Sequence, residues 1–152
     1  MDILKINGGN KLTGEITLHG AKNSALPILS ATILVKGVSI LHNCPKLKDV
    51  DETLSILEGL GCKVKREGST VTVDATDVNS SEIDEKAMRS MRSSILFLGS
   101  LLSRCKEASI FLPGGCDIGA RPIDIHINAL KQLGAEITEN GSSICCKADE
   151  LK

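Results

Sequence analysis

The chain contains two copies of one pattern, and this internal repeat constrains the fold more than any other feature. In the first part of the pattern, matching residues lie 70 positions apart: Ser24/Ser94, Ser30/Ser100, Ser39/Ser109 and Ile40/Ile110, with Lys22 on Arg92. After a three-residue insertion, matching residues lie 73 positions apart: Asp51/Asp124, Leu57/Leu130, Leu60/Leu133, Gly61/Gly134, Gly68/Gly141, Ser69/Ser142 and Ala75/Ala148. The repeat predicts two similar supersecondary units, with the insertion in a surface loop.

Each unit is predicted to run strand, helix, strand, helix and hairpin, which gives an α/β fold of the α+β type. In the first copy, Asn23 or Ser24 is expected to cap a helix that runs to about Leu34, with Pro27 in its first turn. A short β-rich run follows at residues 38–41, and its counterpart is at residues 108–112.

A second helix is expected to begin at Asp49, with Glu52 completing a capping box, and to end at Gly61. Its apolar stripe recurs in the other copy at the same helical spacing, so each stripe is predicted to face a core of its own unit. The two stripes are Val50, Leu54, Leu57 and Leu60, and Ile123, Ile127, Leu130 and Leu133. Glycine-containing turns at residues 67–69 and 140–142 predict the two closing hairpins.

The organisation predicted along the chain has three parts. Residues 1–20 form an N-terminal strand segment, with the strand itself at residues 12–19. Residues 21–78 form the first unit and residues 79–152 the second, and the polar, acidic stretch at residues 77–85 connects them.

Composition excludes several classes of function. With 18 basic and 19 acidic side chains and neither Tyr nor Trp, the chain lacks the basic surface and the stacking platforms of nucleic-acid binders. No apolar run is long enough to span a membrane, and no signal peptide is expected at the N-terminus. The six cysteines form no CxxC pair, so we predict reduced thiols in a cytoplasmic protein, with no disulfide framework and no metal site.

The segment LPGGCDIGARP, at residues 112–122, is the strongest candidate for chemistry. Three glycines around Cys116 indicate a loop that bends sharply or approaches a ligand closely. Most free cysteines are small buried hydrophobic residues, but a thiol in such a loop near the cation Arg121 is a candidate nucleophile or general acid. Arg121 and Pro122 stand at an expected helix start, where an anion would bind.

Lys22 and Asn23 stand at the helix start of the first unit, and Arg92 occupies the equivalent position of the second. A cation and an amide at a helix start suit a small phosphorylated or carboxylated ligand. A lone lysine in this position is more often simply solvated, but two equivalent cations could face one cleft. Asp124, in the first turn, is more commonly only a favourable partner of the helix dipole, and His126 more often caps or covers a helix face than catalyses.

Four motifs together resemble the UDP-N-acetylglucosamine 1-carboxyvinyltransferase family of bacterial enolpyruvyl transferases. They are GAKNSALPIL at residues 20–29, PKLKDVD at 45–51, MRSS at 91–94 and LPGGCDIGARPIDIH at 112–126. The similarity runs over essentially the whole chain, and the PGGC loop is highly specific. The related 5-enolpyruvylshikimate-3-phosphate synthases share the fold but are not known for this cysteine loop.

The resemblance implies an inside-out α/β prism and transfer of the enolpyruvyl group from phosphoenolpyruvate to the 3-hydroxyl of UDP-N-acetylglucosamine, without a cofactor. It implies that Cys116 protonates phosphoenolpyruvate, can form an adduct with it, and reacts with fosfomycin. It also implies that Lys22 and Asn23 bind phosphoenolpyruvate. The residues implied for UDP-N-acetylglucosamine are Arg92, Arg121, Pro122, Ile123, Asp124 and Ile125.

Members of that family have six such units in two domains, and this chain has about two. We therefore expect an N-terminal piece that binds ligands weakly, is inactive alone and could self-associate through exposed edges, with residues 1–20 belonging to the second domain. Two alternatives stay open: a non-catalytic repeat module that binds an anionic metabolite, and a module that pairs with another chain.

Overall fold

A computed structural model of the chain describes residues 3–112 and 122–152. Its helical elements are α1 (Lys22–Ala31), the 3₁₀ turn η1 (Thr32–Leu34), α2 (Lys48–Gly59), α3 (Glu85–Ser90), the 3₁₀ turn η2 (Arg92–Ile95), α4 (Leu96–Cys105) and α5 (Asp124–Gln132). Its strands are β1 (Val38–Leu41), β2 (Lys63–Glu67), β3 (Thr70–Asp74), β4 (Glu107–Phe111), β5 (Glu136–Asn140) and β6 (Ser143–Lys147).

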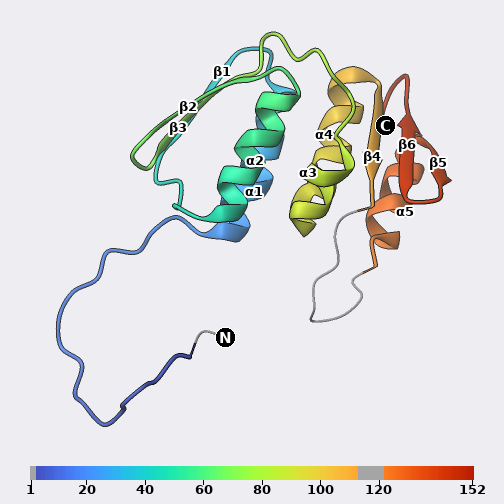
Figure 1. The fold of residues 1–152 in the computed structure, drawn as a ribbon. Coiled ribbons are helices and arrows are strands. Elements are labelled where there is room, and N and C mark those ends of the chain that lie inside the picture. Colours follow the sequence, from blue (N-terminus) through green and yellow to red (C-terminus); the bar gives the residue numbers. More distant parts are fainter. Residues whose placement is uncertain (1–2, 113–121) are drawn as a thin grey trace.

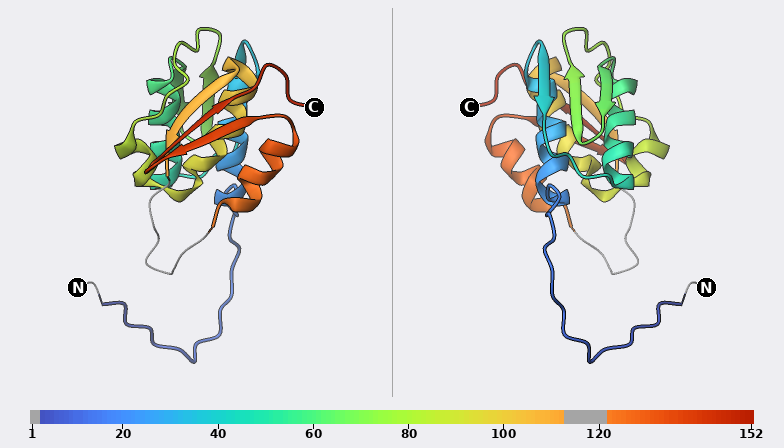
Figure 2. Two further views of the ribbon diagram at one scale, coloured as in Figure 1. Left: turned by 90° about the vertical axis from the view of Figure 1, so that its right-hand side faces the viewer. Right: turned by 90° about the vertical axis from the view of Figure 1, so that its left-hand side faces the viewer.

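The predicted repeat is visible as two antiparallel three-stranded sheets of the same topology, ordered β1-β3-β2 and β4-β6-β5. Helices α1 to α4 lie between the two sheets, and α5 lies beside the second (Figures 1 and 2). Both predicted hairpins are present, with positive φ angles of 59° at Gly68 and 63° at Gly141. Glycine adopts that conformation without steric cost, so these turns follow directly from the sequence.

The prediction of one core per unit was wrong, because the buried side chains of both units form a single cluster. Helices α1 and α4 pack against each other, and α4 also packs against η1, so the two halves share one interior. The stripe of α2 is almost completely buried. The stripe of α5 is less so, with Leu133 42% exposed where its repeat equivalent Leu60 is 1% exposed.

The first strands align one residue differently from the sequence repeat. Ile40 pairs with Thr72, and Ser109 pairs with Cys145. Because Thr72 and Cys145 are equivalent at the offset of 73, Ile40 corresponds in space to Ser109 and not to Ile110. Hydrogen-bond pairing and burial set the register of a strand, and they override a chance identity such as Ile40/Ile110.

The strand expected at residues 12–19 is absent, because residues 3–21 contain neither helix nor strand. Apolar side chains of this segment stay 77–93% exposed: Ile3, Leu4, Ile6, Leu12, Ile16 and Leu18. An alternating apolar pattern forms a strand only where a sheet edge and a core can receive it. Neither sheet of the described residues provides that contact, and Figure 1 shows the segment leading away from the body of the molecule.

Neither predicted helix cap forms. The N-caps are Ala21 and Leu47, with no side-chain cap. Helix α1 therefore begins two or three residues earlier than expected, and α2 begins one residue earlier. Pro27 consequently lies in the second turn of α1, not in the first. Asp49 and Glu52 make ion pairs instead of capping bonds.

An unpredicted short helix, α3, begins where the connector ends. Asp84 caps it by accepting a hydrogen bond from the N–H of Ala87 at 3.0 Å. Just before it, residues 81–83 run along the edge of β4: Ser109 donates to the carbonyl of Ser81 at 2.9 Å, and Ile83 donates to the carbonyl of Ser109 at 3.1 Å. The connector is thereby fixed to the second sheet.

Candidate functional site

The starts of α1, α2, η2 and α5 lie at one end of the molecule (Figure 1). The chain leaves β4 after Phe111 and enters α5 at Asp124 at the same end (Figure 2). The first N–H groups of a helix have no partner within the helix and carry partial positive charge. This end of the molecule is therefore suited to an anionic ligand.

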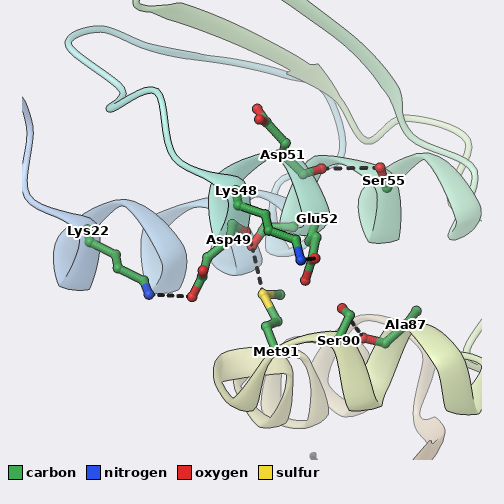
Figure 3. A network of polar contacts seen from close by, with 10 residues as sticks. Lys22, Lys48, Asp49, Asp51, Glu52, Ser55, Ala87, Ser90 and Met91 are labelled. Carbon is green, nitrogen blue, oxygen red and sulfur yellow. Dashed lines mark hydrogen bonds and ion pairs between the residues drawn. The ribbon is translucent and has the colours of Figure 1, made fainter. Parts of the chain in front are cut away.

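Lys22 is the first residue of α1, and Asn23 follows in the same turn. The Lys22 Nζ makes an ion pair with the Oδ2 of Asp49, in the first turn of α2. The two side chains point toward each other between the helices (Figure 3). They are 46% and 34% exposed, so the ammonium group is oriented but still accessible to a ligand.

Arg92 is the first residue of η2, which leads into α4. The fully buried Ser94 fixes this turn, since its Oγ donates to the carbonyl of Met91 at 2.7 Å and to that of Met88 at 2.9 Å. The sequence therefore correctly located two cations at helix starts, Lys22 and Arg92, and the structure puts both at the same end.

Pro122, Ile123, Asp124 and Ile125 lead into α5 at this end. Ile123 packs against the core, whereas Ile125 is 81% exposed and Asp124 is the first, exposed residue of the helix. Leu112, Pro122 and Asp124 help to line a pocket of about 290 Å³, together with Lys131 of α5 and Glu139 of β5. The predicted residues Cys116 and Arg121 lie outside the described residues.

Sequence reasoning missed Asp49 as a site residue. It was interpreted only as a helix-start residue, and its partner Lys22 lies 27 positions earlier in the chain. The repeat gave no indication either, because the equivalent position in the second unit is Pro122. The only signal was the motif at residues 45–51.

Four of the five described cysteines have a different environment from a reactive thiol. Burial raises the pKa of Cys62 and of Cys146 to about 11, and it also raises the pKa of Cys44 and Cys105. The five cysteines among the described residues are free thiols. Residues 3–112 and 122–152 contain no cluster of three or more side chains that could hold a metal ion.

His126 lies half-buried in the first turn of α5, and its buried Nε2 has no hydrogen-bond partner. Burial lowers the pKa of the imidazole below its ordinary value near 6.5. The unfolded state therefore binds more protons than the folded state as the pH falls through this range, and folding stability should decrease with falling pH.

We predict that the free energy of unfolding decreases between about pH 7 and pH 5 in wild type, and that His126→Gln reduces this decrease. Urea titrations followed by circular dichroism at several pH values would measure both curves. His42→Gln is the matched control, since His42 shares an exposed contact with Thr70 at 3.2 Å. Parallel curves for wild type and His126→Gln would contradict the prediction.

Comparison with known proteins agrees with this architecture. The family model of EPSP synthase (3-phosphoshikimate 1-carboxyvinyltransferase) matches residues 6–152. The chain is 58% identical over all 152 residues to UDP-N-acetylglucosamine 1-carboxyvinyltransferase 2 of Caldanaerobacter subterraneus subsp. tengcongensis, and 45% identical to the UDP-N-acetylglucosamine 1-carboxyvinyltransferase of Geobacter metallireducens. It covers 36% of each, so it spans about a third of the length of these relatives.

Solved structures show the same fold at lower identity. The enolpyruvyl transferase NikO from Streptomyces tendae matches 95% of this chain, and 32% of its own, with a TM-score of 0.79 and 22% identity. The EPSP synthase from Acinetobacter baumannii matches 91% of this chain and 33% of its own, with a TM-score of 0.65 and 18% identity.

Within residues 3–112 and 122–152, none of the helices has the length and apolar character needed to cross a bilayer.

Proposed function

The chain belongs to the EPSP synthase (3-phosphoshikimate 1-carboxyvinyltransferase) family, and from this membership we propose that it takes part in enolpyruvyl transfer to UDP-N-acetylglucosamine. The observation that carries this choice of acceptor is the 58% identity, over the full chain, to a UDP-N-acetylglucosamine 1-carboxyvinyltransferase. The proposed role is in the first committed step of peptidoglycan synthesis, in the cytoplasm, and so in cell-wall growth and division.

In the proposed reaction, the Cys116 thiol donates its proton to the methylene carbon of phosphoenolpyruvate. The 3-hydroxyl of the sugar gives its proton to a base and adds to the neighbouring carbon, which gives a tetrahedral ketal. The ketal then loses phosphate together with a proton of its new methyl group, and this elimination restores the carbon–carbon double bond. Several anionic groups must stay close together during these steps, so fixed cations are needed. Lys22 and Asn23 are proposed to bind phosphoenolpyruvate.

Arg92 and Arg121 are proposed to bind the UDP-sugar, together with Pro122, Ile123, Asp124 and Ile125. Those of these residues that the structure describes lie at the end of the molecule where the helices start, and this placement supports the proposal. Both substrates carry phosphate groups, and the helix N-termini there add partial positive charge to that of the side chains.

The exposed apolar side chains of residues 3–18 support self-association through that segment.

Competitive thiol labelling tests the proposal. At pH 8 we expect iodoacetamide to modify Cys116 at least about 10-fold faster than Cys62 or Cys146, because a thiol with a pKa of about 11 is almost entirely protonated at that pH. We also expect phosphoenolpyruvate with UDP-N-acetylglucosamine to slow the labelling of Cys116.

Peptide mass spectrometry would give the rate for each cysteine, with the half-buried Cys145 as the internal reference. Shikimate 3-phosphate in place of UDP-N-acetylglucosamine is the control for the acceptor. Equal rates at Cys116 and Cys145, or equal protection by the two acceptors, would contradict the proposal.

A further inference from the structure

We infer that Asp49 is a positioning residue, whose carboxylate directs the ammonium group of Lys22 toward an anion bound at the helix starts. Lys22 makes its ion pair with Asp49 across the gap between α1 and α2 (Figure 3). This inference rests on the proposed function, because it takes Lys22 as the lysine that binds phosphoenolpyruvate.

The backbone of Asp49 is held in place. Its backbone carbonyl accepts a hydrogen bond at 2.8 Å from the Oγ1 of Thr53, one turn later in α2. Thr53 is fully buried, and its Oγ1 also lies 3.5 Å from the Sδ of Met91, the residue before Arg92. The turn that carries Asp49 is thereby packed against the segment that carries Arg92, and Lys22 is the flexible member of the ion pair.

The neighbouring acidic residues are directed elsewhere. Glu52 pairs with Lys48 at 3.5 Å, and Asp51 pairs with the Nη1 of Arg66 at 2.7 Å. Asp49 and Asp51 are therefore two carboxylates in the same helical turn with different cations. This makes Asp51 a matched control for Asp49.

The ion pair leaves Lys22 able to bind a ligand. An ammonium group has three N–H donors, so one can bond to Asp49 while two remain for the oxygens of an anion. A partly exposed ion pair contributes little to folding stability. What the pair does provide is a single direction for a long, flexible side chain before the ligand arrives, which reduces the entropy lost on binding.

Asp49 could also act in the opposite way, by competing with the anion for Lys22, and the two roles predict changes in anion affinity of opposite sign. If the carboxylate only competed with the anion for Lys22, removing its charge would tighten anion binding. If it orients Lys22, removing it loosens the lysine and weakens binding. The sign of the change in affinity therefore separates the two roles.

The test compares Asp49→Asn, Asp49→Glu and Asp51→Asn in the 152-residue chain. The first readout is the order parameter of the Lys22 ammonium group, from nitrogen-15 NMR relaxation without ligand. The second is the dissociation constant of phosphoenolpyruvate from NMR titration, with inorganic phosphate as a second probe. Backbone amide spectra report whether each variant stays folded.

We expect Asp49→Asn to lower the Lys22 order parameter and to weaken phosphoenolpyruvate binding by about 3–10-fold. Asp51→Asn should leave both unchanged within about twofold, and Asp49→Glu should restore part of the order parameter and affinity. If Asp49→Asn proves unfolded, Asp49→Glu compared with Asp51→Asn tests the same direction of change, with a smaller expected loss. An unchanged Lys22 order parameter, or tighter binding in Asp49→Asn, would overturn the inference.

Failure of the proposed function has a distinct signature. In that case phosphoenolpyruvate would not bind to wild type at millimolar concentrations, although Asp49→Asn still mobilised the Lys22 ammonium group. The order parameter would then support the positioning role, and the titration would contradict the proposed ligand.

Discussion

Replacing Phe97 with alanine is expected to lower the free energy of unfolding by about 3–5 kcal/mol, through lost burial and the cavity left behind. Phe97 is one of only two phenylalanines in a chain without Tyr or Trp, and among the described residues it is the largest fully buried side chain. It belongs to α4, which packs against α1, η1 and β4. The cavity would thus open where the two units meet, and both should lose stability together.

Urea denaturation followed by circular dichroism at 222 nm would measure this loss, since the chain has no tryptophan to report unfolding by fluorescence. Leu12→Ala is the control, because Leu12 is 93% exposed and its loss should change stability by no more than about 0.5 kcal/mol. Should Phe97→Ala not fold at all, Phe97→Leu should fold with a smaller loss. A cost below about 1 kcal/mol for Phe97→Ala would show that α4 does not hold the shared core together.

The repeat made most of this fold predictable. Residues that determine turns were interpreted correctly, since Gly68 and Gly141 turn the two hairpins and Gly61 and Gly134 end the two helices, all four with positive φ. A glycine in such a position acts through local backbone geometry, which is the same in any context. Local signals of this kind can be identified without knowing what the rest of the chain does.

Predictions that depended on distant contacts were less successful. The apolar alternation at residues 12–19 is a typical strand pattern, but no sheet edge of the described residues receives it. Asp49 and Glu52 have the spacing of a capping box, yet both carboxylates make ion pairs. Whether a side chain caps its own helix or pairs with a neighbouring element depends on packing that only the tertiary structure provides.

The residues of the candidate site likewise divide into those that local patterns predicted and those that depend on distant contacts. Lys22 and Arg92 were located from their places at helix starts, because the repeat gave them equivalent positions. Asp49 was missed because its role comes from the approach of α2 to α1, which no local pattern encodes. The link from Thr53 to Met91 is of the same kind, since it joins residues 38 positions apart.

Gly61→Ala is expected to cost about 2–4 kcal/mol, clearly more than the about 1–2 kcal/mol expected for Gly134→Ala. Both glycines follow the last turn of equivalent helices with the same φ of +96°. Their N–H groups donate at 3.0 Å to the carbonyls of Glu58 and Lys131, respectively. The conformational strain of a side chain is therefore the same at both positions.

The surroundings of the two glycines differ. A Cβ on Gly61 would lie 2.9 Å from the carbonyl oxygen of Asp77 and 2.7 Å from the Oδ1 of Asn79, whereas on Gly134 the nearest atom is the carbonyl oxygen of Glu150 at 3.5 Å. The Asn79 side chain can rotate away, but the Asp77 carbonyl moves only with the connector backbone. That backbone is fixed to the end of α2, since the N–H of Asn79 donates to the carbonyl of Leu60 at 3.1 Å.

Equilibrium unfolding of Gly61→Ala and Gly134→Ala would measure the effect of crowding by the connector. The backbone strain that the two variants share cancels when their losses in the free energy of unfolding are subtracted. Gly68→Ala adds a reference without crowding, since no atom lies within 4 Å of the added Cβ. It should cost no more than Gly134→Ala, because its φ of 59° lies in the left-handed region that alanine can adopt, whereas φ is 96° at Gly134. Equal losses for Gly61→Ala and Gly134→Ala would mean that residues 77–79 are not held against α2. Amide hydrogen exchange at Asn79 should accelerate in Gly61→Ala and stay unchanged in Gly134→Ala, because only the former displaces the connector.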